Sequence, residues 1–245
     1  MPFAHCLFAE PLASYLELSA ADCKLVEEAA SRNVKMIGPR RDLVSEGDPP
    51  GSVKVVLEGW VARYKQLRDG RRQILSLLIP GDISDSNVFM LDKMDHSLGS
   101  LTPVRYAEIG QAEFEALAAS SPRIGKALWW RELVEISIQR EWTTNIGQRN
   151  AYERIAHLLC ETYWRMQVRG LAHGNTCDCP LTQTDIADAT GLTPVHVNRT
   201  LQHLRGDGLV ELRAKRLRIT DPKGLQAAGM FSPSYLHPAA PPVAA

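Results

Sequence analysis

The 245-residue chain carries 28 Lys and Arg residues and 28 Asp and Glu residues, so any affinity for nucleic acid must come from a local basic patch, not from its overall charge. The apolar fraction of 44 % is ordinary for a globular protein, while the N-terminus does not resemble a secretory signal and no apolar run reaches the length of a membrane span. Five cysteines, an odd number, do not suggest a disulfide framework, and we expect a cytoplasmic protein that does not contact a membrane.

The first half of the chain predicts a β-rich domain with helices at its edges. After a loop around Pro11, Ser19 and Asp22 form a start like a capping box for a small amphipathic helix. Runs with strand character, separated by Gly, Pro and Asp turns, follow at residues 34–38, 42–45, 53–57, 60–64, 74–78 and 105–109. Many short strands at this spacing indicate a closed sandwich or barrel. Residues 111–120 predict a short helix after it.

Residues 122–147 form the longest helical candidate. Apolar side chains cover most of its circumference, so we expect it to be buried on more than one side, against the β-domain and against a second copy of the chain. A core helix within one chain is the alternative. One seam with alternating steps of three and four residues is too mixed for a firm coiled-coil prediction. Its members are Leu128, Arg131, Glu135, Ile138, Trp142 and Asn145.

A further helix is predicted at residues 151–168, followed by a loop at 169–181 and then by two short helices within residues 182–205. Thr182 caps the first of the two short helices and Gly191 ends it. Thr193 caps the second, with Pro194 at its first position, where a missing N–H costs nothing. The periodicity turns Val197, Leu201 and Leu204 inward and leaves polar side chains outside.

The outer face of the second short helix suits the major groove of DNA. It carries Val195, His196, Asn198, Arg199 and His203. Arginine can donate two hydrogen bonds to guanine, and asparagine can pair with adenine. Residues 209–213 and 217–220 alternate as strands around a basic turn, which predicts a wing. Between Thr193 and Thr220, six basic and two acidic residues give a local charge of +4, as phosphate contact requires. An ordinary pair of helices is the alternative.

This order of elements resembles the Crp/Fnr family of bacterial transcription regulators over nearly the whole chain. The motif LTQTDIADATGLTPVHVNRTL carries the strongest similarity, and the turns Glu46-Gly47-Asp48, Leu57-Glu58-Gly59, Asp69-Gly70-Arg71-Arg72 and Pro80-Gly81-Asp82 resemble that family's β-roll. The resemblance implies an α+β fold with an N-terminal antiparallel, jelly-roll-like β-roll at residues 1–121, a dimerisation helix at 122–148, a winged helix-turn-helix at 149–230 and a flexible tail at 231–245. It also implies a homodimer on a palindromic site, with half-sites about 34 Å apart.

Position by position, the resemblance assigns phosphate contacts to Thr182 and Thr193 and a guanine to Arg199. Val195 replaces a glutamate of relatives and offers contact only with a thymine methyl, while Pro194 and His196 also depart from the best-known members, so we expect a different consensus. The expected DNA-binding residues are Thr182, Thr193, Pro194, Val195, His196, Asn198, Arg199, His203 and Arg216. Residues 169–180 match a region where some relatives contact RNA polymerase, a further expected partner.

The sensor region departs from relatives whose ligands are known. In cAMP-binding members, a Gly-Glu-Leu segment and an Arg-Ser pair hold the ligand; here the matching stretches are residues 84–87 and His96-Ser97, where Asp85 would repel an anion. The four-cysteine set of iron–sulfur members is reduced to Cys6 and Cys23 near the N-terminus. We therefore predict neither cofactor. No single histidine points to haem, and a regulator that needs an unidentified ligand or redox effector remains the alternative.

Other reactive side chains favour ordinary roles. His173, Cys177 and Cys179 lack the spacing of a zinc site, and we interpret them as part of a plain exposed loop, with a redox-sensing dithiol as the alternative. Asp95, His96 and Ser97 are triad residue types, but adjacent side chains cannot form a relay. Residues of a candidate ligand cavity are assigned to core and surface instead: Trp60, Arg63 and Tyr64. No set of residues supports an enzyme.

Overall fold

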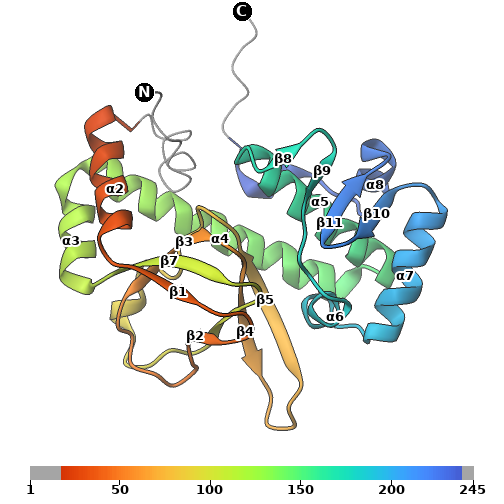
Figure 1. The fold of residues 1–245 in the computed structure, drawn as a ribbon, viewed down its shortest axis with the longest axis horizontal. Coiled ribbons are helices and arrows are strands. Elements are labelled where there is room, and N and C mark those ends of the chain that lie inside the picture. The colour runs from red at the N-terminus through yellow and green to blue at the C-terminus, as the bar shows by residue number, and fades with distance from the viewer. Residues whose placement is uncertain (1–17, 239–245) are drawn as a thin grey trace, which may run out of the picture. The chain divides into compact units, whose positions relative to one another are not determined.

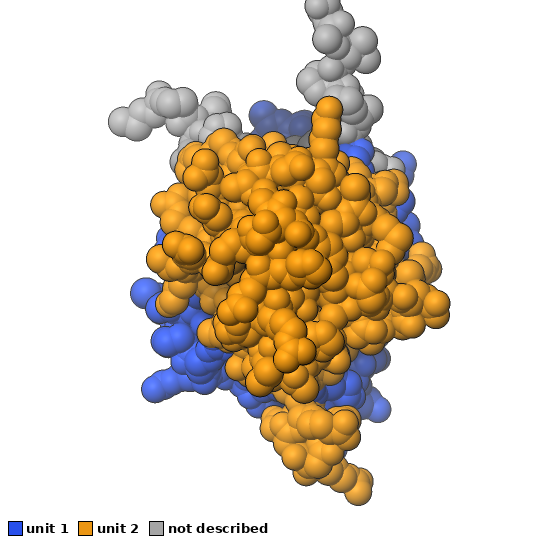
Figure 2. Space-filling view, turned by 90° about the vertical axis from the view of Figure 1, so that its right-hand side faces the viewer, with its two compact units in different colours: residues 1–65, 77–136, 237–245 blue, residues 66–76, 137–236 orange. Residues whose placement is uncertain are grey.

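The computed structural model describes residues 18–238 and contains two compact units (Figure 1, Figure 2). The first unit comprises the described residues up to Lys65, residues 77–136 and the last two described residues; the second comprises residues 66–76 and 137–236. The loop expected around Pro11 and the chain beyond residue 238 lie outside the described residues. Within residues 18–238, no helix combines the length and apolar character of a membrane span.

The first unit is a β-roll with helices packed on it. The elements that lie wholly or partly in this unit are, in chain order, α2 (Ala20–Arg32), β1 (Val34–Ile37), β2 (Asp42–Val44), β3 (Val53–Glu58), β4 (Val61–Gln66), β5 (Arg72–Leu78), the 3-10 helix η1 (Val88–Met90), β6 (Ser97–Ser100), β7 (Val104–Ile109), α3 (Gln111–Ser120) and α4 (Pro122–Gln148). The strands form two antiparallel sheets, β1-β7-β3 and β2-β6-β4-β5. Between them, a buried cluster gathers side chains from both sheets: Val56, Val61, Leu78, Leu98, Val104 and Tyr106.

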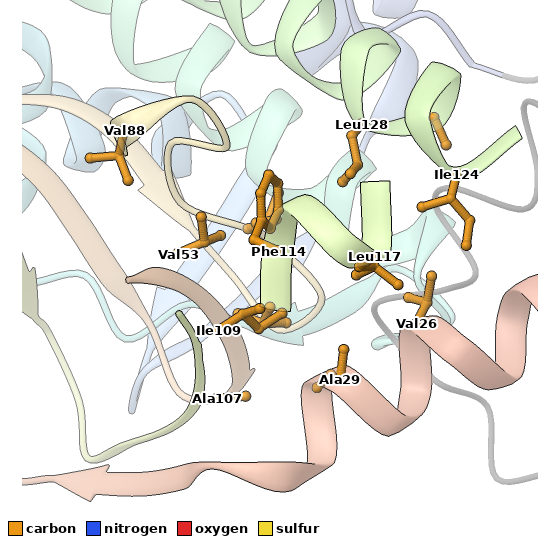
Figure 3. Packing of buried hydrophobic residues seen from close by; sticks show 14 of the residues in the cluster. Val26, Ala29, Val53, Val88, Ala107, Ile109, Phe114, Leu117, Ile124 and Leu128 are labelled. Atoms are coloured by element: carbon orange, nitrogen blue, oxygen red, sulfur yellow. The ribbon is translucent and has the colours of Figure 1, made fainter. Parts of the chain in front are cut away.

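A second buried cluster joins the helices to the first of these sheets (Figure 3). α2 begins where expected, because Asp22 N–H donates to Ser19 Oγ at 3.1 Å and Ser19 N–H donates to Asp22 Oδ2 at 2.9 Å. The buried face of α2, which includes Ala29, meets apolar side chains of α3, α4 and the sheet, among them Ile109, Leu117 and Ile124. The predicted β-rich domain with flanking helices is confirmed.

One strand of the β-roll differs from the expectations. β6 was not predicted, because Ser97–Ser100 contains one apolar side chain and a glycine and shows no alternation. It forms because both of its edges are paired, with β2 and with β4. Gly99 allows a close approach there, since a Cβ would lie 3.0 Å from the Tyr64 ring and from Asp42 Oδ1.

The long helix α4 buries most of the mixed seam that was too irregular for a firm coiled-coil prediction. Leu128, Arg131, Ile138, Trp142 and Asn145 are all less than 9 % exposed. A second apolar stripe, which begins at the residue after Leu128, is exposed instead. Its side chains are Trp129 at 68 %, Leu133 at 58 % and Ile136 at 43 % exposed. The mixed seam was thus not a surface feature, because its charged members form ion pairs inside the first unit: Arg131 Nη2 lies 2.6 Å from Asp82 Oδ1.

The second unit contains a helical core and a four-stranded sheet. Its further elements are α5 (Ala151–Val168), β8 (Ala172–His173), β9 (Thr176–Asp178), α6 (Gln183–Thr190), α7 (Pro194–Gly206), β10 (Val210–Arg213), β11 (Arg216–Ile219), α8 (Pro222–Ala228) and the 3-10 helix η2 (Pro233–Leu236). Asn150 caps α5 through a capping box with Glu153. The antiparallel sheet has the order β10-β11-β9-β8.

Two segments of this unit are more ordered than expected. The predicted loop at 169–181 contains the hairpin β8–β9, which extends the wing because β9 pairs with β11, with Cys177 opposite Leu217. Part of the expected flexible tail forms η2, where Leu236 is buried and the Tyr235 hydroxyl donates to Glu161 Oε2 at 2.7 Å. Neither pairing is visible in local sequence patterns, because both partners lie far away in the chain.

Candidate nucleic-acid interface

The helix-turn-helix begins with a closed capping box at α6. Thr182 Oγ1 donates to Asp185 Oδ2 at 2.7 Å, and Asp185 N–H donates back to Thr182 Oγ1 at 3.1 Å. Gly191 ends α6 in the left-handed conformation, with φ of 67°, which a side chain would strain. Arg154 of α5 donates to the Thr190 carbonyl at 3.0 Å and so supports the same helix end.

The two predicted phosphate contacts differ in what their hydroxyl groups can do. Because the Thr182 hydroxyl proton is directed to Asp185, it cannot reach a phosphate while the cap is closed. Thr193 Oγ1 instead accepts from His196 N–H at 3.3 Å, which leaves its hydroxyl proton available for an acceptor outside the helix. The geometry therefore supports Thr193 more directly than Thr182 as a side-chain phosphate donor.

The predicted inward and outward faces of α7 are confirmed. Val197, Leu201 and Leu204 are buried, and Val195 is 71 % exposed. An open groove lies over the outer face, which we call the reading groove. It is lined by Gln183, Pro194, Val195, Asn198, Arg199 and Gln202. Four of the expected DNA-binding residues thus meet in one groove, with donors and acceptors of the kind that read base edges.

A second groove, the wing groove, joins the start of α6 to α7 and the tip of the β10–β11 hairpin. Its basic side chains are Arg205, Arg213 and Lys215, and the lining also includes Thr182 and Gln183. The turn of the hairpin places Ala214 and Lys215 at positive φ, 48° and 61°, as a two-residue hairpin turn requires. Cations on a strand hairpin beside a recognition helix are suited to the phosphate backbone.

Four of the expected contact residues lie outside both groove linings: Thr193, His196, His203 and Arg216. Arg216 is exposed on β11, opposite Asp178 of β9. His196 and His203 lie one heptad apart on α7 and line neither groove. The His203 ring packs against Tyr152 with centroids 4.9 Å apart, and its Nε2 lies 3.6 Å from Asp207 Oδ2. His203 therefore has a role within the unit.

Two glutamines in the reading groove were missed by sequence reasoning. Gln202 is exposed at three residues after Arg199 and seven after Val195, so helical periodicity alone could have placed it on the same face. Gln183 Oε1 accepts from Asn198 Nδ2 at 3.2 Å, which orients the asparagine expected to contact a base. That contact joins the two helices, and no spacing within either helix indicates it.

Cys177 and Cys179, two free cysteines of the winged domain, are buried, so the expectation that they lie in an exposed loop was wrong. Cys177 is 2 % exposed and Cys179 is fully buried, because both pack under the wing. Burial raises the pKa of Cys177 to about 11 and that of Cys179 to about 12, so both stay protonated at neutral pH. Cys160 is buried in α5, and burial raises its pKa to about 12.

Inside the β-roll, charged side chains meet where the sequence stretches 84–87 and 96–97 come together. Arg63 of β4 is buried, with Nη2 3.3 Å from Asp85 Oδ1 and Nη1 2.6 Å from Glu135 Oε1. His96 Nε2 lies 3.1 Å from Asp85 Oδ2 and its Nδ1 lies 2.7 Å from Asp95 Oδ1. Burial tends to raise the pKa of Asp85, but the Arg63 charge and the His96 hydrogen bond outweigh this and hold it well below its usual range.

The role of Arg63 was missed from sequence, because its acidic partners lie far away in the chain. Trp60 and Tyr64 are buried, and the Tyr64 hydroxyl donates to Asp42 Oδ1 at 2.8 Å, in keeping with structural roles. Cys6 lies outside the described residues, and Cys23 is partly buried on α2. Among the described side chains, no group of three or more His, Cys, Asp or Glu is placed to hold a metal ion.

Comparison with known proteins agrees with this organisation. Residues 36–121 match the model of a cyclic nucleotide-binding domain, and residues 153–228 match that of a Crp-like helix-turn-helix domain. The transcriptional activatory protein AadR of Rhodopseudomonas palustris is 30 % identical over 212 residues, covering 86 % of either chain. The transcriptional activator protein FnrL of Cereibacter sphaeroides is 30 % identical over 177 residues, covering 71 % of either chain.

A solved structure shares the fold. FixK2 from Bradyrhizobium japonicum superposes with a TM-score of 0.72 at 24 % sequence identity, covering 82 % of this chain and 98 % of that one. The β-roll, the long helix and the winged helix-turn-helix therefore occur together in known regulators. With a basic wing, an outward recognition helix and relatives of this identity over most of its length, the chain belongs to the Crp/Fnr family of DNA-binding transcription regulators.

Proposed function

We propose that the protein acts as a homodimer that binds a palindromic DNA site through the reading groove of each copy. The observation that carries the dimer is the exposed apolar stripe on α4. Trp129, Leu133 and Ile136 follow one another at steps of four and three residues, so they lie on one side of the helix. A surface patch of large apolar side chains on a long helix fits a symmetric contact with a second copy.

In this proposal, each α7 enters a major groove. Arg199 reads a guanine, Val195 contacts a thymine methyl and Asn198, oriented by Gln183, contacts an adenine. Thr193 and the cations of the wing groove bind phosphates and set the register. Arg216, the first residue of β11 after the turn of the wing, adds a phosphate contact.

We further propose that DNA binding needs neither cyclic AMP nor an iron–sulfur cluster. Support comes from the roll interior, where Asp85 is held ionised beside Arg63 and His96 and would repel a cyclic phosphate. Arg63, the buried arginine beside Asp85, is already paired with Asp85 and Glu135. A regulator that needs a different effector would instead bind DNA weakly when purified alone.

The proposed setting is the bacterial cytoplasm, where the protein acts by binding and not by catalysis. The hairpin β8–β9, within residues 169–180, offers His173, Gly174 and Asn175 as an exposed surface for RNA polymerase. Replacing His173 and Asn175 together with alanine tests this assignment, and Gly174 is kept because its φ of 55° would strain a side chain: transcription from a target promoter falls while DNA affinity is unchanged. Lost DNA affinity, or unchanged transcription, contradicts it.

Selection of bound fragments from random duplex DNA, at a stated salt concentration, tests the main proposal. We expect enrichment of a palindrome by the purified protein without additives, and complexes with two chains per duplex. Enrichment of no sequence, or of a site without two-fold symmetry bound by one chain, would overturn it. Enrichment only after addition of a cell extract would favour the effector-dependent alternative.

A further inference from the structure

The hairpin of β4 and β5 belongs to both compact units. Residues up to Lys65 and from Leu77 onward are part of the roll, whereas residues 66–76 form part of the DNA-binding unit (Figure 2). The tip is closed by its own turn, with Leu67 N–H donating to the Arg71 carbonyl at 2.8 Å. The chain thus leaves the roll after Lys65, makes its turn within the DNA-binding unit and returns to the roll at Leu77.

One arginine fastens this tip to the helix-turn-helix. Arg72 Nε donates to Asp188 Oδ2 at 2.8 Å, and Arg72 Nη2 donates to Asp185 Oδ1 at 3.2 Å. The two aspartates lie three residues apart on α6, so they share one side of that helix. A guanidinium that donates to two carboxylates at once is fixed in orientation by the two hydrogen bonds, in addition to the attraction between opposite charges.

The bond to Asp185 reaches the start of the DNA-binding motif. Asp185 is fully buried, and its other oxygen, Oδ2, accepts from Thr182 N–H at 2.9 Å and from the Thr182 hydroxyl at 2.7 Å. A buried carboxylate is stable only when it is paired and hydrogen-bonded. Arg72 therefore supplies the counter-charge for the carboxylate that caps α6.

A second contact holds the tip to the same unit. Gln139, in the part of α4 that belongs to the DNA-binding unit, donates to the Leu75 carbonyl at 2.9 Å. By contrast, Arg71 is 77 % exposed and pairs with Asp69, two residues away in the turn. The two neighbouring arginines thus differ in their partners: Arg72 donates to two carboxylates of α6, whereas Arg71 pairs with a carboxylate of the same turn.

We propose that Arg72 is a positioning residue for DNA recognition, which holds α6 to the hairpin and thereby sets how α7 is presented to the major groove. Because the strands that carry Arg72 are anchored in the roll, a shift of the hairpin moves the capped end of α6 and changes DNA affinity. The proposal rests on the reading groove proposed above.

The test uses three variants: Arg72→Gln, Asp188→Asn and the double variant that combines these two changes. Arg71→Gln is the matched control, because it removes the same charge from the neighbouring position. DNA affinity is measured on the duplex selected by the wild-type protein, over a range of salt concentrations. Arg72→Gln and Asp188→Asn should each weaken binding about fivefold or more, the low end of typical coupling between sites. The double variant should bind no worse than Arg72→Gln, because Arg72→Gln already breaks the contact with Asp188 that Asp188→Asn removes. Arg71→Gln should match the wild type.

Asp188→Asn separates positioning from simple electrostatics. Loss of a negative charge near DNA should strengthen binding if only the field matters, whereas positioning predicts weaker binding. Arg72→Gln should also leave the salt dependence unchanged; a slope lower by about one would mean that Arg72 itself contacts a phosphate.

Three results overturn the proposal: tighter binding by Asp188→Asn, a lower salt slope in Arg72→Gln, or equal affinities for Arg72→Gln and Arg71→Gln. Thermal unfolding of each variant checks that the fold is intact, and Arg72→Lys, which keeps the charge, should recover part of the affinity. If the wild-type protein selects no duplex, the proposal that the reading groove binds DNA is wrong. This result differs from the three above, so a failure of that proposal can be told apart from a failure of the role of Arg72.

Discussion

Replacing Leu133 by aspartate should break the dimer that α4 is proposed to form. Leu133 lies between Trp129 and Ile136 in the exposed stripe and is itself 58 % exposed. Complete burial of a leucine side chain contributes about 1.5–3 kcal/mol. Covering the exposed part would therefore contribute about 1–2 kcal/mol in each copy, or about 2–4 kcal/mol per symmetric dimer. The aspartate adds the cost of desolvating two like charges near the two-fold axis.

Since about 1.4 kcal/mol corresponds to a tenfold change, we expect the dimer dissociation constant to rise about 100-fold or more. Sedimentation equilibrium of the full chain measures it, and Leu91→Asp is the matched control, because Leu91 is 45 % exposed in the loop after η1. The selected palindrome should also lose affinity for Leu133→Asp and keep it for Leu91→Asp. An unchanged dimer in Leu133→Asp, or equal loss in both variants, would refute the assignment of the stripe.

Arg199→Ala should cost about 1–3 kcal/mol in DNA binding and relax the preference at one base position of each half-site, whereas Arg216→Ala should weaken all sequences alike; a uniform loss for Arg199→Ala, measured on a set of single-base variants, would mean that it contacts phosphate only. Burial and the nearby Arg149 lower the pKa of His157 to about 4 from 6.5. The unfolded chain then takes up a proton that the folded chain does not, so stability should fall by up to about 3 kcal/mol as the pH drops through this window; urea unfolding should show a smaller fall for His157→Gln, and parallel pH profiles would contradict it. Cyclic AMP should bind more weakly than about 1 mM, which corresponds to only about 4 kcal/mol, and should leave DNA affinity unchanged; a tighter complex by calorimetry would show that the roll accepts an anion beside Asp85.

Local sequence patterns predicted most helices and strands because their caps and periodicity are local. Ser19, Asn150, Thr182 and Thr193 all cap the helices expected of them. β6 escaped prediction because a strand of Ser, Leu, Gly and Ser is stabilised by its two neighbours and by the close approach of Gly99 to Tyr64. Such pairing depends on distant parts of the chain.

The candidate site also contains features that follow from local sequence patterns and features that depend on distant residues. The outward side chains of α7 follow from helical periodicity, which placed Val195 and Arg199 on one surface and could have added Gln202. The partners of Arg63 and Arg72 could not be predicted, because Glu135 and Asp188 lie 72 and 116 residues further along the chain. On α4, periodicity found two apolar sides but not which one packs inward, since that depends on the shape of the surface it meets.

Changing the distance between the two half-sites of the selected palindrome tests the central claim most directly. A rigid dimer with two recognition helices should bind best when the half-site centres are one helical turn apart, about 34 Å, and half a turn of added duplex should turn one half-site away from its helix. We therefore expect affinity to fall nearly to that of a single half-site when about five base pairs are inserted. Affinity that does not depend on the spacing would contradict the account, because it would mean that the two helices do not read DNA as one symmetric unit.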